Sequence, residues 1–568
     1  MEKRVFIAVL LSFLILAAYQ TYFAPSPTKT NGPAGTTPAV TAAPAAGAPV
    51  PSAPAATSSP APGTGRTPAQ PMAAPAAAEA VISDTAPHDI VVETDDVIAV
   101  FSTEGAVLKS WKLKHYLASP DSKGSSPLLD LVPSDVPGDK PFTLKSDDAA
   151  VAGVLAHALY RPSVDHLALG SSSGTLNFEY QDKSGLGVRK TFHFRPDGKA
   201  YVIGFDATVD KAGKTQPVTV AWGPALGLGY VPDGSREAQP AAGVFVRNDK
   251  VERPSAKTLA ETPNYDDTFL YAGVADHYFL SAVFPGTHQV KLTYQPVTAP
   301  VPGDTTGKTQ RTFVAYSVSV PESASLSYFF GPKDFDVLHT VDPQLVRAID
   351  FGIFQWLVVP LLQALKWVNT YTHNYGWAIV VLTVLMNLAI FPLRHRSMVS
   401  MKKMQSLQPQ VKAIQDRYAK YKITDPERQK ANQEVMALYK TKGVNPASGC
   451  LPMVLTFPLL FAFYALLGSA IELRGAPFMF WIHDLSLKDP YFVLPIVMAA
   501  SMFWQQRMMP TAGGDPIQQK MFMFMPLIFL FTFLWSPAGL AVYWFTSNIM
   551  AIGQQYVTNR MIASGTVK

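Results

Sequence analysis

Long apolar segments and short alternating segments occupy different parts of this chain. Residues 5–23 form an apolar run about long enough to cross a bilayer, and Lys3 and Arg4 precede it. The run continues into interfacial aromatic residues and lacks a small-residue cleavage site. It therefore predicts an uncleaved transmembrane anchor over 1–23 rather than a signal peptide. The two basic residues place the N-terminus in the cytoplasm.

The next two segments differ in their apolar pattern. Residues 24–85 consist mainly of Pro, Ala, Ser, Thr and Gly and predict an extended, disordered linker. Residues 86–335 carry short runs in which apolar and polar side chains alternate, and these predict one large β-sandwich. The clearest runs are Val97–Ser102, Thr175–Gln181, Val188–Arg195, Tyr201–Val209 and Arg311–Val320. Pro196-Asp197-Gly198 predicts a turn between two of these strands, because proline presets the first turn dihedral and glycine tolerates a positive φ.

Residues 350–370 are apolar on one helical face only, which predicts an interfacial amphipathic helix. The apolar face holds Phe354, Leu357, Val358, Leu361, Leu365 and Val368, and the polar face holds Gln355, Gln363, Lys366 and Asn369. A membrane span here would place the basic segment after Leu393 outside the cell, against the positive-inside bias. The helix is therefore expected to lie on the outer surface of the membrane.

Five later apolar segments predict transmembrane helices, making six spans with the N-terminal anchor. They cover residues 377–393, 449–471, 491–507, 521–535 and 540–557. A cytoplasmic loop, 508–520, separates the fourth span from the fifth, and a short cytoplasmic tail, 558–568, follows the sixth. The pattern predicts a multi-pass α-helical membrane protein with cytoplasmic termini and an all-β domain on the outer side.

Residues 394–448, between the second and third spans, are strongly basic and carry apolar residues at steps of three and four. They predict an antiparallel helical hairpin in the cytoplasm. Its charge has two interpretations: a solvated face that sets membrane topology, or a docking surface for the ribosome, a targeting receptor or anionic lipid headgroups. The candidate docking residues are Lys412, Arg417, Lys420, Lys422, Arg428 and Lys430.

Composition agrees with a membrane protein that has a soluble part, since 48% of the 568 residues are hydrophobic and 16% are charged. The net charge of +5 excludes a generally basic nucleic-acid binder. The single cysteine, Cys450, excludes an intrachain disulfide and a Cys-based zinc cluster. Because common hydrolase and nucleotide-binding motifs are also absent, no enzyme activity, cofactor, metal site or specific nucleic-acid partner is expected.

Several polar side chains lie where hydrocarbon is expected. Thr383 and Asn387 in the second span are four residues apart and share one helix face. With Thr456 in the third span and Ser547 and Asn548 in the sixth, they predict a hydrophilic substrate groove, because an unsatisfied amide in lipid costs several kcal/mol. The alternative is interhelical hydrogen bonding that holds the bundle together.

A series of short motifs runs along the second half of the chain. They are Tyr328-Phe329-Phe330-Gly331-Pro332-Lys333, Ser400-Met401-Lys402-Lys403-Met404 with Leu407-Gln408-Pro409, Asn445-Pro446 with Gly449-Cys450-Leu451-Pro452, Ala476-Pro477-Phe478 with Trp481-Ile482-His483-Asp484-Leu485-Ser486, Asp489-Pro490-Tyr491, Asp515-Pro516, and Gly539-Leu540 with Tyr543-Trp544 and Ser547-Asn548. In this order and spacing the chain resembles the YidC family of membrane protein insertases, in its Gram-negative form with an extra anchor and a periplasmic domain.

The resemblance implies a five-helix core around a hydrophilic groove open to the cytoplasm, to which Tyr543 also contributes, a coiled-coil hairpin, and a periplasmic super-sandwich similar to sugar mutarotases. It implies insertion of nascent membrane proteins into the inner membrane, alone or beside the Sec translocon, with release of hydrophobic segments into the membrane lipids. No covalent chemistry and no small-molecule substrate are implied, since a fold shared with mutarotases does not establish a sugar-processing activity.

One departure from the family pattern concerns the groove. The family usually carries an arginine on the second span, where this chain has Asn387, and a glutamine on the third, where this chain has Thr456. An asparagine can hydrogen-bond a translocating tail but does not attract acidic residues over distance, so we expect weaker handling of clients with acidic external tails. Arg394, seven residues on and about 10 Å nearer the cytoplasm, either substitutes for the missing charge or serves as a snorkelling anchor.

Three other functions stay open on the sequence. They are an accessory Sec-associated folding factor without its own insertase activity, a small-solute transporter, and an envelope protein that binds or modifies carbohydrate. The apolar segments show no inverted repeat, which argues against the transporter. The soluble segment shows no clustered carboxylates or histidines, which argues against carbohydrate catalysis.

Overall fold

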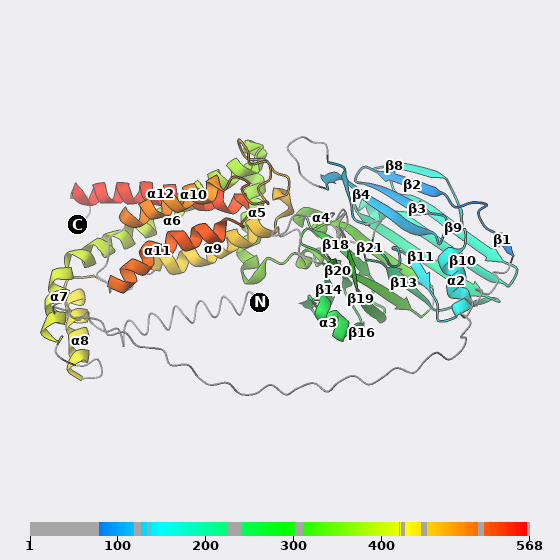
Figure 1. Ribbon diagram of the computed structural model, residues 1–568, viewed down its shortest axis with the longest axis horizontal. Helices are drawn as coiled ribbons and strands as arrows, with labels where there is room; N and C mark the ends of the chain where they lie inside the picture. Colours follow the sequence, from blue (N-terminus) through cyan, green and yellow to red (C-terminus); the bar gives the residue numbers. More distant parts are fainter. Residues whose placement is uncertain are drawn as a thin grey trace, which may run out of the picture.

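The structure is a computed structural model. It describes residues 79–118, 126–132, 136–224, 226, 241–300, 310–321, 323–419, 421, 426–444, 451–508 and 516–564. The predicted anchor, 1–23, and most of the predicted linker, 24–85, lie outside these residues. The described chain forms a β-sheet domain followed by a bundle of helices, and the two parts lie end to end (Figure 1).

The sheet domain contains three sheets over a shared apolar core, so the predicted β-sandwich is confirmed. Its strands are β1 (Ala80–Ile82), β2 (Asp89–Thr94), β3 (Val97–Ser102), β4 (Val107–Leu117), β5 (Leu128–Asp130), β6 (Thr143–Lys145), β7 (Arg161–Pro162), β8 (His166–Gly170), β9 (Gly174–Asp182), β10 (Leu186–Phe194), β11 (Val202–Lys211), β12 (Lys214–Thr215), β13 (Val218–Trp222), β14 (Ala242–Arg247), β15 (Lys250–Glu252), β16 (Asn264–Asp267), β17 (Tyr271–Ala275), β18 (Phe279–Phe284), β19 (Val290–Pro300), β20 (Gln310–Val320) and β21 (Ala324–Pro332). The largest sheet has the order β1-β9-β10-β11-β21-β18-β17-β14-β15, with β7 paired to β9 and β12 to β11. The smaller sheets have the orders β16-β19-β20-β13-β6 and β5-β4-β3-β2-β8.

Alternation of apolar and polar side chains explains how the strands form the core. On β10 the buried positions are Leu186, Val188, Lys190, Phe192 and Phe194, whereas Arg189 points outward. Every second side chain of a strand lies on the same face, so this register turns four apolar side chains and one lysine into the core. Aromatic rings then fill the space between the sheets. The ring centroid of Phe142 lies 5.1 Å from that of Phe192 and 4.9 Å from that of Trp222.

The fully buried Lys190 is held by backbone carbonyl groups from two distant turns. Its Nζ donates to the carbonyl oxygens of Gly105 at 2.7 Å, Ala106 at 3.2 Å and Phe142 at 2.9 Å. All three acceptors have left-handed backbone, with φ of 70°, 46° and 69°. Left-handed φ is costly for alanine and phenylalanine, so the hydrogen bonds from Lys190 Nζ compensate for strained backbone at these acceptors.

The predicted turn after β10 is present as the 3-10 turn η1 (Pro196–Gly198). Gly198 has the expected positive φ of 72°, but Asp197, at 56°, and Arg195, at 49°, are left-handed as well. The Arg195 guanidinium pairs with Asp96 and donates to the carbonyl oxygen of Gly198 at 3.2 Å. These bonds stabilise a turn that local propensity alone does not explain.

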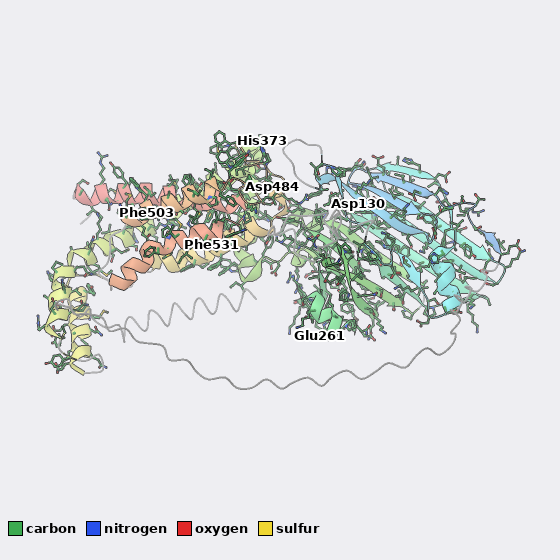
Figure 2. All side chains as sticks on the ribbon, in the orientation of Figure 1. Asp130, Glu261, His373, Asp484, Phe503 and Phe531 are labelled. Carbon is green, nitrogen blue, oxygen red and sulfur yellow. The ribbon has the colours of Figure 1, made fainter. Side chains whose placement is uncertain are left out.

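The helices are α2 (Ala149–His157), α3 (Ala256–Glu261), α4 (Phe335–Val341), α5 (Gln355–Thr372), α6 (Tyr375–Ser406), α7 (Gln408–Arg417), α8 (Pro426–Thr441), α9 (Leu451–Ser469), α10 (Val493–Met508), α11 (Pro516–Phe533) and α12 (Ala538–Ala563). Within the described residues, α6 is long and apolar enough to cross a membrane, and Phe457–Ser469 and Phe524–Phe533 are shorter apolar stretches. The five spans predicted after the anchor fall on α6, α9, α10, α11 and α12. Phe503 of α10 and Phe531 of α11 are exposed on the helical part (Figure 2), as expected for a surface that faces lipid.

Helix α5 lies between the sheet domain and the other helices (Figure 1) and packs against α6 and α9. Val358, Leu361, Leu362, Leu365 and Val368 form its buried face. The opposite face exposes the large aromatic side chains of Trp356, Trp367 and Tyr371. Exposed tryptophan and tyrosine are typical of the boundary between lipid and water, so this face is suited to lie in the membrane surface.

Helices α7 and α8 lie at the end of the molecule opposite to the sheet domain (Figure 1). They contact each other through Tyr418, whose hydroxyl donates to Glu434 Oε1 at 2.6 Å. Val411 and Ala431 are buried on the two helices.

Candidate substrate site between α6 and α12

The predicted polar stripe of α6 faces α12. Thr383 is fully buried and Asn387 is 5% exposed, and Asn387 lies where α6 packs against α12. The Thr383 hydroxyl donates to the carbonyl oxygen of Ile379 at 2.6 Å, and Asn387 Nδ2 donates to that of Thr383 at 2.8 Å. Each polar group thus uses the preceding helical turn as a partner, which reduces the cost of its burial.

Arg394 extends this stripe toward the basic end of α6. Its Nη1 donates to Asn387 Oδ1 at 2.9 Å and lies 3.4 Å from Gln554 Oε1 of α12. Helical side chains lean toward the helix N-terminus, so a long side chain seven residues later reaches back to Asn387. The guanidinium therefore lies beside residue 387, the position at which the family usually carries an arginine. This geometry favours the substitution interpretation over that of a snorkelling anchor.

Gln554 joins the two helices and is absent from the residues predicted on sequence. Its Nε2 donates to the backbone oxygen of Asn387 at 2.8 Å, while its Oε1 accepts from Arg394. One turn further, Thr558 is fully buried and its Oγ1 lies 3.0 Å from His395 Nδ1. Gln554 lies seven residues, or about two helical turns, after Ser547, so both lie on nearly the same face of the helix. This spacing is the feature of the sequence that could have identified Gln554.

Asn548, by contrast, belongs to a second polar contact. Its Nδ2 donates to Ser501 Oγ of α10 at 3.0 Å, and that hydroxyl donates to the carbonyl oxygen of Met498. Among the described side chains, no hydrogen bond connects Asn548 or Ser547 to Asn387. Among the predicted groove residues whose side chains the structure describes, Asn387 and Asn548 therefore belong to different polar contacts, because α12 carries polar side chains toward α6 and toward α10.

The two remaining groove candidates differ in what the structure describes. Tyr543 is buried and stacks on Phe463 of α9, with ring centroids 4.5 Å apart and an angle of 10° between the planes. Thr456 also belongs to α9, but its side chain lies outside the described part of the chain. Tyr543 thus connects α12 with the helix that carries Thr456.

The candidate docking residues are described only in part. Lys412, Arg417 and Lys430 are exposed on α7 and α8. Lys420 and Lys422 lie outside the described residues, as does the side chain of Arg428. Lys430 donates a hydrogen bond to the Glu427 carboxylate, and this bond raises the pKa of Lys430.

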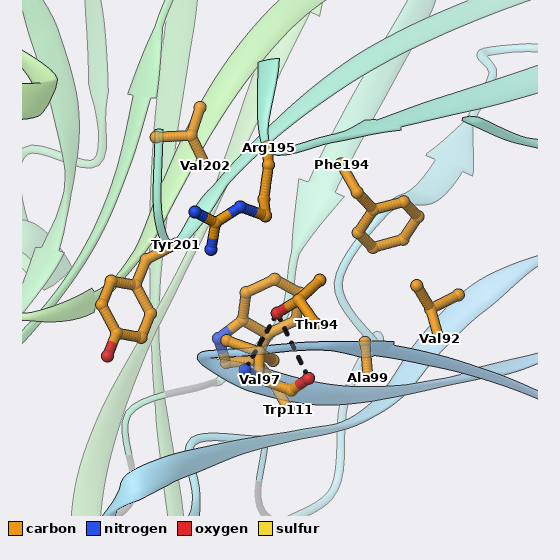
Figure 3. A pocket seen from close by; sticks show the side chains of 9 residues that line it. All are labelled: Val92, Thr94, Val97, Ala99, Trp111, Phe194, Arg195, Tyr201 and Val202. Carbon is orange, nitrogen blue, oxygen red and sulfur yellow. Dashed lines mark hydrogen bonds between the residues drawn. The ribbon is translucent and has the colours of Figure 1, made fainter. Parts of the chain in front are cut away.

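The sheet domain holds a cavity beside Trp111 and Arg195 that is too small for a sugar (Figure 3). Its volume of about 10 Å³ is room for roughly one water molecule. Thr94 Oγ1 bonds the backbone of Val97 at its edge, and Trp111 Nε1 donates to the carbonyl oxygen of Phe330 at 2.9 Å. This cavity gives no support to a carbohydrate-binding function.

The sandwich, the apolar helices and their buried polar contacts define a membrane protein with a large extramembrane β domain. Residues 89–364 match the family model described as YidC periplasmic domain, and residues 367–565 match the model described as 60Kd inner membrane protein. The chain is 36% identical over 570 residues to the membrane protein insertase YidC of Geotalea daltonii, covering 99% of this chain and all of the relative. It is also 36% identical over 581 residues to the membrane protein insertase YidC of Geobacter metallireducens, covering both chains in full. The chain therefore belongs to the YidC family of membrane protein insertases.

A solved structure titled "Active YidC insertase crystal structure with the first transmembrane domain resolved" matches 85% of this chain and 95% of its own, at 19% identity and a TM-score of 0.34. Because this score is low, the family assignment rests on the sequence relatives.

Proposed function

We propose that this protein inserts and folds integral membrane proteins in the inner membrane, alone or beside the Sec translocon. The observation that carries the proposal is the polar stripe between two apolar helices, in which Thr383, Asn387 and Gln554 are buried and Arg394 is half-buried. Such a stripe offers hydrogen bonds and one positive charge to the polar flank of a client, while the exposed apolar helices offer the client's hydrophobic segment a path to lipid.

The groove of this proposal has Thr383, Asn387 and the charge of Arg394 on its α6 side. Its other walls carry Tyr543, Ser547 and Asn548 of α12 and Thr456 of α9, so the polar side chains lie on separate walls and not in one cluster. The Arg394 guanidinium exchanges its bonds to Asn387 and Gln554 for a carboxylate of the client. A charge-assisted bond is stronger than a bond to a neutral amide, so the exchange is favourable for an acidic tail. Clients with acidic external tails are therefore handled through Arg394 rather than through residue 387.

The proposed topology has six spans, cytoplasmic termini and a helical hairpin, 394–448, in the cytoplasm. The separation of α7 and α8 from the sheet domain supports it, because the family model assigns that domain to the periplasm (Figure 1). The exposed aromatic face of α5 supports an outer membrane surface between the two ends. The hairpin then docks the ribosome or a targeting receptor.

The test of autonomous insertion uses liposomes that contain only the purified full chain and a small single-span client. We expect protease protection of the client well above that in empty liposomes. Background protection with well-folded protein would contradict autonomous insertion and favour an accessory folding role beside the Sec translocon. Tracer flux of small solutes through the same liposomes tests the transporter alternative.

A variant with four lysines of the hairpin replaced by glutamate is expected to bind ribosomes about tenfold more weakly in co-sedimentation at moderate salt, because several contacts to phosphate are lost together. The replaced residues are Lys412, Lys420, Lys422 and Lys430. Residues Lys412 and Lys430 are exposed, so these two changes do not disturb the helix pair.

The matched control reverses four exposed lysines of the sheet domain, Lys214, Lys250, Lys257 and Lys291. It changes the net charge equally but is expected to leave co-sedimentation as in the wild type. Equal binding by both variants would favour the interpretation that the hairpin charge only sets topology.

A further inference from the structure

A partly buried ion cluster joins three elements that are far apart in the sequence. Lys366 of α5 places its Nζ 2.7 Å from Asp336 of α4 and 2.7 Å from Glu472, and 3.6 Å from Asp334. Glu472 lies in the 3-10 turn η6 (Ile471–Leu473), directly after α9, and its side chain is 6% exposed. Asp334 caps the N-terminus of α4, which follows the central strand β21 of the large sheet. One ammonium group therefore connects the sheet domain, the interfacial helix and the outer end of α9.

Two further contacts attach the end of α9 to the sheet domain. His277 Nε2, in the turn between β17 and β18, lies 2.7 Å from the carbonyl oxygen of Gly468 in the last turn of α9. Arg474, two residues after Glu472, donates to the carbonyl oxygen of Ala118 at 3.3 Å and lies over the ring of Phe279. Contacts from the β17–β18 turn, from the start of β18 and from the residue after β4 thus converge on residues 468–474.

The same helix reaches the proposed site. Phe463, one and a half turns before Gly468, stacks on Tyr543 of α12. Polar contacts at the end of a rigid helix fix its position, and a stacked pair transmits that position to its neighbour. Asp484 and His373 mark this end of the helical part beside the sheet domain (Figure 2).

We propose that Lys366 is a positioning residue through which the sheet domain holds α9, and with α9 the Tyr543 wall of the insertion site, in place. The inference rests on the proposed function, because it assigns the extramembrane domain a role in insertion by the helices. Lys366 suits this role because it is the cation shared by the three carboxylates of the cluster. Burial raises the pKa of the Glu472 carboxyl and Lys366 opposes that shift. Removing Lys366 therefore leaves a buried carboxyl without its cation, and the contact between α5 and η6 opens.

The test measures the distance between the two parts and the insertion activity on the same variants. Cys450 is replaced by serine, and spin labels are attached at cysteines that replace the exposed residues Glu261 of α3 and Lys488 of the loop before α10. We expect narrow distance distributions for the parent protein and for Lys366→Arg, which keeps the cation. Lys366→Met is expected to broaden the distribution and to lower client insertion about threefold or more.

The matched control is Lys109→Met, which removes an exposed ion pair to Asp89 at 2.7 Å within the sheet domain. It is expected to change neither readout. A narrow distribution for Lys366→Met, with or without loss of insertion, would overturn the positioning role. If that variant does not fold, Glu472→Gln removes the same contact and is measured in its place. Failure of the parent protein to insert would count against the proposed function, while the distance measurement would still test the coupling.

Discussion

Replacing Lys190 with methionine is expected to lower the free energy of unfolding of the sheet domain by about 3 kcal/mol, because buried carbonyl groups lose their donor. The three acceptors are held with left-handed backbone and face the core, so water does not replace the ammonium group. Hydrogen exchange of the β10 and β4 amides in the full chain measures the effect. We expect these amides to lose protection in the variant.

The pH dependence of the same amides gives a second readout. Burial lowers the pKa of Lys190 from 10.5 to about 7. Between these values the unfolded chain binds a proton that the folded chain lacks, so the stability contributed by this group rises as the pH increases from 7 to 10.5. Lys190→Met is expected to remove this slope.

Lys109→Met on β4 again serves as the control, because its ion pair is exposed and contributes about 1 kcal/mol or less. A Lys190→Met variant with wild-type protection and an unchanged pH slope would show that the amino group of Lys190 does not hold the two turns.

Replacing Arg394 with methionine is expected to reduce insertion of clients with acidic external tails about tenfold, the loss of roughly 1.4 kcal/mol of attraction. Clients with neutral tails are expected to change less than about twofold, since hydrogen bonding by Asn387 and Gln554 remains. Protease protection of paired clients that differ only in tail charge measures the difference.

Two further variants test whether insertion of acidic clients depends on where the positive charge lies in the site or only on its presence nearby. Arg396→Met removes an exposed arginine two residues away and is expected to leave both client classes unaffected. In the double variant Asn387→Arg with Arg394→Met, the charge returns to the position of the family pattern, and acidic clients are expected to recover. Equal losses for acidic and neutral tails in Arg394→Met would contradict a role in charge recognition.

The strands of the sheet domain could be predicted where the sequence pattern that forms them lies within a few consecutive residues. The run Val97–Ser102 coincides with β3, along which buried and half-buried side chains alternate. Lys190 also lies in such a run, but its acceptors are 85, 84 and 48 residues away, so no local signal indicates that a lysine belongs in this core.

The same limit applies to the site. The spacing of four residues placed Thr383 and Asn387 on one face, and the structure buries both. The spacing does not reveal which helix that face meets, because tertiary packing decides it. The sequence therefore indicated neither Gln554 nor Ser501, the residue that Asn548 contacts. Lys366 was likewise predicted on a polar face, although its carboxylate partners come from two other elements.

The position of Asn387 along α6 has a consequence for the energy of translocation. Tyr375 begins the helix, and twelve residues separate it from Asn387, which corresponds to about 18 Å along the axis. A hydrocarbon core is about 30 Å thick, so a polar tail that has reached Asn387 has little more than half of that thickness left to cross. Because the desolvation barrier grows with the apolar distance, the proposed function gives the stripe the effect of a locally thinner bilayer, provided by the protein rather than by the lipid.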